Sequence, residues 1–355
     1  MSSSTMRAAV FKGAGDMSLD TIPRPGPDPE KVLVRVTRTG ICTFERRIYS
    51  GLQKHIPMPS IAGHEAAGVV EDAPAGTGLA PGDKVALDLV YRCGHCYYCV
   101  RGFDNQCVQI YSEGLRWQEY HIIGGGFGEY ISVDPSKVFK VDPSVPDHII
   151  ALSEPLGCII HSFSKTTVTL GDSIAIIGAG TMGSLHAVLA RNFGCKVLMS
   201  DPDEERLEFA RETLGVDRVV NPSREDPIEA AKEMSDGRGV NAVFVTAGVA
   251  AAAEQAIEMA GKYSTVVLYA STHPPAKISL DWNRIHYNEI RIDGTESRTR
   301  DDVRVAAELL PKLDLEPLVS RQIPLEELPG ELANGVPTGA TQRVVVNLES
   351  SGGNR

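Results

Sequence analysis

Four cysteines have a spacing that suggests metal binding. They lie within fifteen residues, at Cys93, Cys96, Cys99 and Cys107. Their C-x2-C-x2-C-x7-C spacing allows four thiolates on one loop to surround a single tetrahedral Zn²⁺. Four thiolates leave no open coordination position, so we expect a structural zinc and a solvent-facing His95. Free buried thiols or an iron–sulfur cluster are the alternatives.

A Gly-x-Gly-x-x-Gly motif follows the apolar run 174–177, and its members are Gly178, Gly180 and Gly183. The first glycine permits a tight turn, the second lets the backbone approach a pyrophosphate, and the third allows close packing of helix on strand. The start of the next helix, with Thr181 and Met182, offers N–H groups and a positive dipole end to phosphates. The motif therefore predicts dinucleotide binding.

An acidic residue ends the next expected strand, 196–201. Asp201 lies eighteen residues after Gly183, close to the ~20 expected for a carboxylate that binds a ribose 2′-hydroxyl. A carboxylate there repels a 2′-phosphate, so we expect NAD rather than NADP, with Arg206 as a further coenzyme contact. An ordinary αβ turn with a surface aspartate is the alternative, but strand, glycines, helix, strand and acid occur in order.

The elements that must position these motifs change in kind near residue 156. Before it, turn-rich β-leaning runs indicate a compact β-rich domain, at 7–11, 31–37, 66–71, 84–89 and 129–133. After it, strands are expected at 174–177, 196–201, 218–221, 242–247, 263–270 and 289–294. Helices are expected at 184–194, 204–214, 227–234, 250–260 and 302–313. This alternation predicts an α/β, doubly wound parallel sheet, and a last strand, 343–348, that rejoins the first domain.

Composition limits the compartment and the partners. The 355 residues suffice for two domains, and a net charge of −11 without a basic run argues against nucleic acid or membrane partners. No apolar run approaches the ~20 residues of a membrane span, and the N-terminus lacks a secretory signal pattern. We expect a cytoplasmic protein whose clustered cysteines bind metal rather than form disulfides.

Three more segments stand out only in combination: Cys42 in Gly-Ile-Cys-Thr-Phe-Glu, His64 in Gly-His-Glu, and Glu154 in Ser-Glu-Pro. With the cysteine loop and the glycine motif, in this order, they resemble the zinc-dependent medium-chain dehydrogenase family over nearly the whole chain. The Glu-Pro segment resembles the polyol (sorbitol) and threonine dehydrogenase branch. The resemblance implies a β-rich GroES-like catalytic domain (1–155, with 297–355 returning to it) and a Rossmann domain (156–296).

The resemblance also implies a catalytic zinc held by Cys42, His64 and Glu154, with a water or substrate oxygen in the fourth position. Glu65 would lie beside the metal and exchange with a ligand as substrate enters. The metal would polarise an alcohol oxygen and lower its pKa, and the alcohol carbon would give hydride to the nicotinamide. Cys158 is an alternative third ligand, and each of these residues taken alone also fits ordinary packing.

The chain departs from the family where many relatives carry a proton relay. They place Ser or Thr two residues after the first cysteine and His five residues after it, whereas this chain has Phe44 and Arg47. Phe has no exchangeable proton and Arg stays protonated, so neither can replace the relay. Thr43 and Tyr49 are substitute candidates. Phe44 would also fill space beside the zinc, which favours an unusual substrate.

Two expectations concern the surroundings of the metal. Glu45 can orient His64 from behind. Residues expected by position to line the pocket are Phe44, Tyr49, Trp117, Glu119 and Trp282.

Together these features predict a zinc-dependent oxidoreductase that transfers hydride between NAD and a secondary alcohol or ketone, such as a polyol, cyclitol, sugar or amino alcohol. It would carry one catalytic and one structural zinc, and the resemblance implies a homodimer or homotetramer. The altered relay leaves open an NAD-bound epimerase or lyase with transient oxidation. A non-catalytic nucleotide-binding protein is the alternative from another class.

Overall fold

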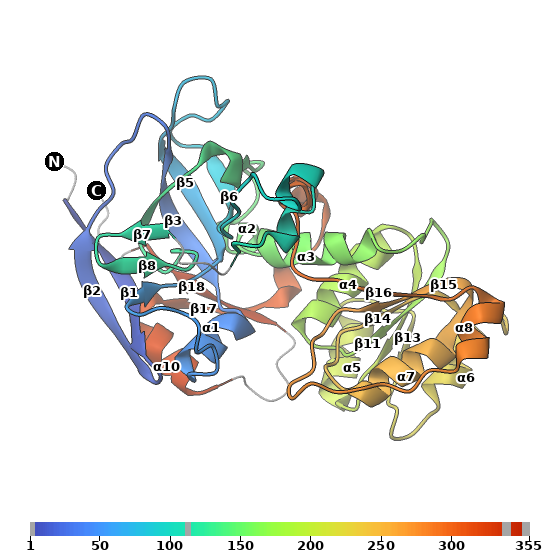
Figure 1. The fold of residues 1–355 in the computed structure, drawn as a ribbon. Coiled ribbons are helices and arrows are strands. Elements are labelled where there is room, and N and C mark those ends of the chain that lie inside the picture. Colours follow the sequence, from blue (N-terminus) through green and yellow to red (C-terminus); the bar gives the residue numbers. More distant parts are fainter. Residues whose placement is uncertain (1–3, 111–114, 336–341, 350–355) are drawn as a thin grey trace.

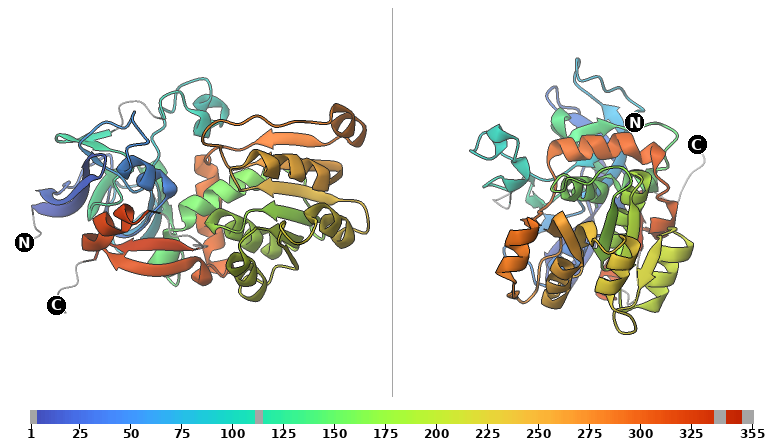
Figure 2. Two further views of the ribbon diagram at one scale, coloured as in Figure 1. Left: turned by 90° about the horizontal axis from the view of Figure 1, so that it is seen from below. Right: turned by 90° about the vertical axis from the view of Figure 1, so that its right-hand side faces the viewer.

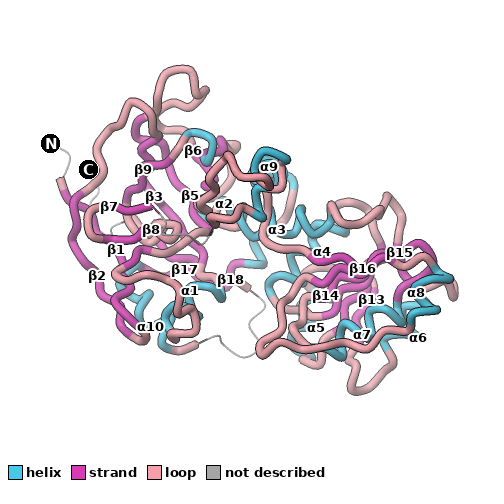
Figure 3. Tube along the Cα trace, viewed as in Figure 1, coloured by secondary structure: helices cyan, strands magenta, loops and turns pink. Residues whose placement is uncertain are grey.

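The structure is a computed structural model that describes residues 4–110, 115–335 and 342–349. Figure 1 shows a strand-rich lobe at left and, at right, a lobe in which strands and helices alternate. Figure 3 shows the same division by secondary structure, with helices between the two lobes. No helix within these described ranges is both long and apolar enough to cross a membrane.

Two β-sheets build the first lobe, because short runs of Val, Ile and Ala alternate with turns that contain Gly and Pro. The smaller sheet, in the order β2-β1-β4-β8-β7, contains β1 (Thr5–Gly13), β2 (Asp16–Pro23), β4 (Ser60–Ile61), β7 (Leu115–Trp117) and β8 (Tyr120–Ile122). The larger sheet, in the order β10-β6-β5-β3-β18-β17 with β9 on β3, contains β3 (Val32–Gly40), β5 (Glu65–Asp72), β6 (Lys84–Asp88), β9 (Tyr130–Val133), β10 (Val138–Lys140), β17 (Val319–Pro324) and β18 (Arg343–Asn347). The pairing of β18 with β3 brings the C-terminal strands, red in Figure 2, into this lobe.

One parallel sheet forms the second lobe, in the order β13-β12-β11-β14-β15-β16. Its strands are β11 (Ser173–Ile177), β12 (Lys196–Ser200), β13 (Arg218–Val220), β14 (Val240–Val245), β15 (Ala260–Leu268) and β16 (Arg291–Gly294). Its helices are α4 (Thr181–Asn192), α5 (Glu204–Glu212), α6 (Pro227–Met234), α7 (Ala250–Met259) and α8 (Trp282–Asn288). Figure 2 shows helices on both sides of the sheet. The strand order is that of a Rossmann fold, which confirms the predicted fold class.

Helices at the junction bind the two lobes together: α2 (Asp147–Ile150), α3 (Ser153–Phe163) and α9 (Arg300–Leu309). Leu156 and Ile159 of α3 are fully buried in one apolar cluster that reaches from Ala86 in the first lobe to Ile174 and Ile176 in the Rossmann sheet. Helices α1 (Thr43–Tyr49) and α10 (Leu328–Ala333) pack on the first lobe. This shared apolar core holds the two lobes together.

Several element boundaries differ from the sequence expectation. Helix α4 begins at Thr181 rather than 184, because Gly180 takes the extended N-cap conformation and the third glycine lies inside the first turn. Helix α9 begins at Arg300, since Thr299 and Asp302 form a capping box. Strand β2 was not predicted because it is largely exposed and polar, although it pairs with β1 along most of its length.

Candidate metal and coenzyme site

A thiol, an imidazole and a carboxylate converge at the end of the larger sheet. Cys42 is the N-cap of α1, directly after β3, while His64 precedes β5 and Glu65 begins it. One ligand atom from each of the three lies within 4.8 Å of the others. Glu65 pairs with Gly40 across the strands, and any side chain at Gly40 would overlap the Glu65 carboxylate. Strand pairing therefore delivers three potential ligands to one point.

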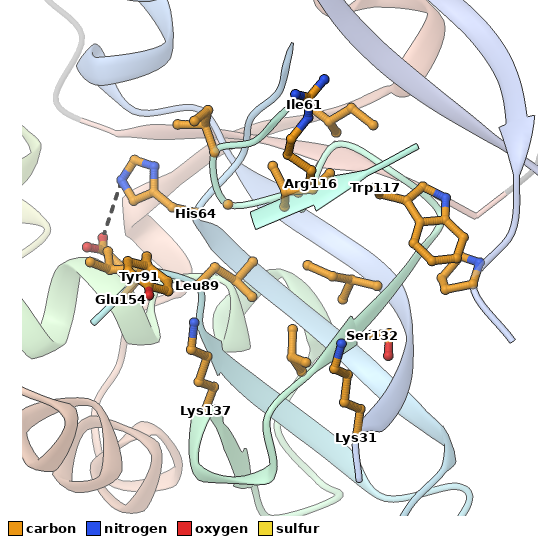
Figure 4. Close-up of a pocket in the computed structure, with 18 of the residues that line it drawn as sticks. Lys31, Ile61, His64, Leu89, Tyr91, Arg116, Trp117, Ser132, Lys137 and Glu154 are labelled. Carbon is orange, nitrogen blue, oxygen red and sulfur yellow. Dashed lines mark ion pairs between the residues drawn. The ribbon is translucent and has the colours of Figure 1, made fainter. Parts of the chain in front are cut away.

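Glu154 reaches the same point from the first turn of α3. Its Oε2 lies 4.0 Å from His64 Nε2, as the dashed line in Figure 4 marks. Its Oε1 lies 2.6 Å from Nη1 of Arg298 and also accepts a 3.5 Å hydrogen bond from the Cys158 thiol. The carboxylate in the mutually close group of three is therefore that of Glu65. Glu154 contacts His64, and Cys158 contacts Glu154.

A buried carboxylate contacts the Nδ1 side of the His64 ring. Glu45, in the first turn of α1, is fully buried, and its Oε1 lies 2.6 Å from His64 Nδ1. Its Oε2 accepts the backbone N–H of Cys42 at 3.1 Å. When Nδ1 donates to Glu45, Nε2 keeps its lone pair free for a metal, the arrangement common among metal-binding histidines. Glu45 thus fixes both the thiol-bearing backbone and the imidazole.

The four-cysteine loop also gathers its sulfur atoms. One ligand atom from each of Cys93, Cys96, Cys99 and Cys107 lies within 4.8 Å of the others. The backbone N–H of Cys96 donates to Cys93 Sγ, and that of Cys93 donates to Cys107 Sγ, each at 3.3 Å. Donors aimed at sulfur stabilise thiolates, and the N–H groups of Cys99 and Val108 lower the pKa of Cys96 to about 6. Four thiols with such donors fit a structural zinc, and His95 is exposed.

The glycine motif forms the turn between β11 and α4. Gly178 has φ +109°, and a Cβ there would lie 2.6 Å from Thr246 Oγ1, while one at Gly183 would overlap the Gly178 carbonyl. Asp201, at the end of β12, accepts the Ala179 N–H at 2.7 Å, so the acid braces the turn itself. Arg206 Nη1 lies 3.6 Å from the Asp201 carboxylate. Thr181 and Met182 begin α4 beside this turn.

Comparisons with known proteins agree with this geometry. The family model described as alcohol dehydrogenase GroES-like domain matches residues 28–147, and that described as zinc-binding dehydrogenase matches residues 181–312. L-threonine 3-dehydrogenase of Pyrococcus abyssi is 32% identical, over 97% of this chain and 98% of its own. Sorbitol dehydrogenase of Halalkalibacterium halodurans is 30% identical, over 89% of this chain and 91% of its own. A structure described as a zinc-binding dehydrogenase from Sinorhizobium meliloti, bound to NADP, is 30% identical, with a TM-score of 0.86 over 97% of this chain and 100% of its own.

The chain belongs to the zinc-dependent medium-chain dehydrogenase family. Within it, the chain lies in the polyol and threonine dehydrogenase-like branch and is a zinc-dependent alcohol oxidoreductase.

Burial and mutual contact shift the pKa values of the titratable groups in the dehydrogenase site. Burial raises the pKa of Glu65 to about 7, an effect that Arg343 opposes, and burial together with Glu65 raises the pKa of the Cys42 thiol. Burial lowers the pKa of His64, but Glu45, Cys42 and Glu154 outweigh it and hold that pKa well above its ordinary value. A set made of a thiolate, an imidazole and a carboxylate suits zinc.

Two buried arginines of the dehydrogenase, which the sequence did not single out, hold the carboxylates. Arg298 Nη2 lies 3.2 Å from Asp88 Oδ1, in addition to its contact with Glu154. Arg343, the first residue of β18, lies 2.8 Å from Glu65 and 3.8 Å from the sulfur of Met182 at the coenzyme turn. Both arginines come from C-terminal segments far from their partners in sequence, so no local pattern could have identified them.

A cavity of about 540 Å³ opens beside His64 and Glu154. Phe44 and Trp117 line it, as expected, and the Phe44 ring meets the His64 ring edge-on with centroids 5.7 Å apart. The other three expected lining residues are not among the described residues of its wall. Tyr49 packs against the core of the first lobe, Glu119 is exposed in the β7–β8 turn, and Trp282 is 80% exposed on α8.

Of the two altered relay positions of the dehydrogenase, Phe44 lies against the His64 ring, whereas Arg47 contacts the second lobe. Thr43, the first residue of α1, is exposed. Arg47 Nη1 lies 3.2 Å from Nε2 of His273, a residue of the second lobe that also contacts Ser271. Arg47 therefore forms a contact between the two lobes. No described contact places it beside His64.

Proposed function

We propose that the protein is an NAD-dependent dehydrogenase that oxidises a secondary alcohol, such as a polyol, cyclitol, sugar or amino alcohol, or reduces the corresponding ketone. The convergence of Cys42, His64 and Glu65 within 4.8 Å, with Glu154 beside them, carries the proposal. The sorbitol and threonine dehydrogenases among its relatives support the substrate class. A non-catalytic nucleotide-binding protein would have no need for these side chains to converge.

Cys42, His64 and Glu154 would hold the catalytic zinc, with Glu65 exchanging with a ligand as substrate enters, and the four-cysteine loop would hold a structural zinc. Zinc at the inner site would act as a Lewis acid that lowers the pKa of an alcohol oxygen. Glu45 keeps the imidazole in the tautomer that presents Nε2. Arg298 orients the Glu154 carboxylate through an ion pair.

The coenzyme would lie on the glycine turn, with its pyrophosphate at the start of α4 beside Gly180, Thr181 and Met182. Asp201 would bind the ribose hydroxyls and repel a 2′-phosphate, which favours NAD. Arg206, beside Asp201, would be a further coenzyme contact. The absence of a side chain at Gly180 supports close approach by the pyrophosphate, since a Cβ there would meet only the Arg206 guanidinium, at 4.0 Å.

We further propose domain boundaries at 1–155, 156–296 and 297–355, with the last segment returning to the catalytic domain, in keeping with the β18–β3 pairing. A cytoplasmic homodimer or homotetramer is the proposed form, with a small-molecule alcohol or ketone as its partner in catalysis.

The test uses zinc-loaded protein with NAD or NADP and a panel of polyols and amino alcohols, while metal content is measured in parallel. Cys42→Ser should lose the inner zinc and turnover but keep the outer zinc. Cys195→Ser, at a buried cysteine outside both clusters, is the matched control and should keep both. Turnover that survives complete removal of metal would contradict the proposal. Accumulation of NADH in step with product would exclude the epimerase or lyase alternative.

A further inference from the structure

The cavity beside His64 contains a buried lysine that no acid neutralises directly. Lys137 ends the short 3-10 helix Pro135–Lys137, is 8% exposed and lines the same cavity as His64 and Glu154. Within the described part of the chain, its Nζ makes no hydrogen bond or ion pair, and it lies 5.9 Å from the centre of the Tyr91 ring. Buried lysines almost always have a partner, so an unpaired one in a cavity wall indicates a missing ligand.

The acids nearest to this lysine are already engaged. Asp88 pairs through one oxygen with Arg92 and through the other with Arg298. The Asp134 carboxylate accepts the Ser136 N–H at 2.8 Å. These carboxylates are therefore occupied elsewhere and leave the Lys137 ammonium without a direct counter-charge.

The local charge balance points the same way. Burial lowers the pKa of the Lys137 ammonium; the charges of Asp88 and Asp134 oppose this shift, while Arg92 and Arg300 add to it. The ammonium is thus poorly solvated and has both acids and cations nearby, but no acid in direct contact. An anion entering the cavity would gain a charge-assisted hydrogen bond and would supply that contact.

The position of Lys137 suits a substrate that spans the cavity. In Figure 4 its side chain points toward Leu89 and Tyr91, on the side of the cavity where Glu154 and His64 lie. The cavity volume of about 540 Å³ is large enough for a small polyol, and His64 and Lys137 both line the cavity. Of the other lining cations, Lys31 has Asp28 at 4.0 Å and Arg298 has Glu154, while Arg116 is exposed to solvent and donates to the Glu119 carbonyl.

We propose that Lys137 binds an anionic group of the substrate, a carboxylate or a phosphate, so that the preferred alcohol is acidic rather than neutral. This inference rests on the proposed dehydrogenase function. An anion held at Lys137 would also select which hydroxyl of the substrate lies beside His64. Lys137 is thus a specificity-determining residue of the substrate cavity.

The test is an equilibrium titration of zinc-loaded protein with three probes: sorbitol, gluconate and sorbitol 6-phosphate. The wild type should bind one or both anionic probes more tightly than sorbitol, and the two anionic arms separate a carboxylate from a phosphate preference. Lys137→Met should weaken anion binding about 10- to 100-fold, the range expected for loss of a charge-assisted hydrogen bond. Sorbitol binding should weaken much less than the binding of either anion.

Control variants test whether the loss of anion binding is specific to Lys137. Lys137→Arg should keep most of the anion binding, and Lys137→Gln provides a second neutral variant if Lys137→Met does not fold. Lys140→Met removes a neighbouring exposed lysine that pairs with Asp83 at 2.7 Å and lies outside the cavity wall. Anion binding by that variant should equal the wild type.

The inference is overturned if both anions bind no better than sorbitol, or if Lys137→Met binds them as the wild type does. Failure of the proposed function appears differently: no alcohol in the panel would yield NADH or NADPH, whatever the result of the titrations. Steady-state kinetics with the same probes then separates the two, since a neutral-alcohol dehydrogenase would turn over sorbitol equally well with and without Lys137.

Discussion

Nδ1 of His64 lies 2.6 Å from Oε1 of Glu45, a carboxylate that is completely buried in the first turn of α1. The same carboxylate accepts the backbone N–H of Cys42. One side chain therefore sets the positions of two proposed zinc ligands without being a ligand itself.

The first prediction concerns Glu45→Gln. The amide keeps the volume but cannot hold the imidazole N–H with a full negative charge, so inner-site zinc affinity should fall about 10- to 100-fold. Chelator competition measures the affinity, and the outer zinc should be unaffected. Glu233→Gln, on the exposed face of α6, is the control. Equal affinity in Glu45→Gln and wild type would show that the contact does not support metal binding.

The second prediction concerns coenzyme choice. Asp201→Asn keeps an acceptor for the Ala179 N–H but removes the charge that would repel a 2′-phosphate. The ratio of kcat/KM for NAD over NADP should fall at least about tenfold, equivalent to ~1.4 kcal/mol. Asp226→Asn, at the α6 N-cap, should leave the ratio unchanged. A wild type that prefers NADP would remove the assigned role of Asp201.

The third prediction concerns the four-cysteine loop. Cys96→Ser removes one of four converging thiols, so the outer zinc should be lost and the melting temperature should fall, because structural zinc binding contributes directly to folding. Metal analysis combined with thermal unfolding measures both effects. A variant that keeps two zinc ions per chain and the wild-type melting temperature would argue for free thiols at this loop.

The fourth prediction concerns stability in acid. Burial lowers the pKa of His186 from 6.5 to about 4, although its hydrogen bond to the Met182 carbonyl opposes the shift. Between these pH values the unfolded chain binds a proton that the folded chain does not, so stability falls as pH falls from 6.5 to 4. The loss should reach about 3 kcal/mol at ~1.4 kcal/mol per pKa unit.

His186→Gln tests this assignment, because glutamine does not titrate. Its unfolding free energy should fall less steeply over that window, even if it starts lower. His286→Gln, at an exposed histidine of α8, should keep the wild-type slope. Metal release in acid affects all three proteins alike, so the difference between slopes isolates His186. Parallel curves for His186→Gln and wild type would refute the assignment.

Local patterns predicted most of the fold. The alternating strand and helix patterns after residue 156, with the glycine motif at Gly178, sufficed to predict a doubly wound parallel sheet, because each pattern lies in contiguous residues. Strand β2 was not predicted because its polar, exposed sequence pattern resembles that of a loop. The C-terminal strand was expected from its β-branched residues, but its pairing register with β3 depends on tertiary contacts.

The candidate site was predictable only in part. Cys42, His64 and Glu154 were named through family resemblance, and the spacing of the cysteine loop was informative by itself. The contacts of Arg298 and Arg343 join residues more than 140 positions apart, from Glu154 and Glu65 respectively, and no periodicity encodes such pairs. Lys137 likewise looks like an ordinary surface lysine until its burial in the cavity wall is seen.

The most direct measurement is anomalous X-ray scattering at the zinc edge from crystals grown with zinc and NADH. The account predicts two peaks per chain, one among the four cysteines and one bounded by Cys42, His64 and a carboxylate of Glu154 or Glu65, with the nicotinamide beside the second. A single peak at the cysteine loop, or an inner peak away from Cys42 and His64, would contradict it.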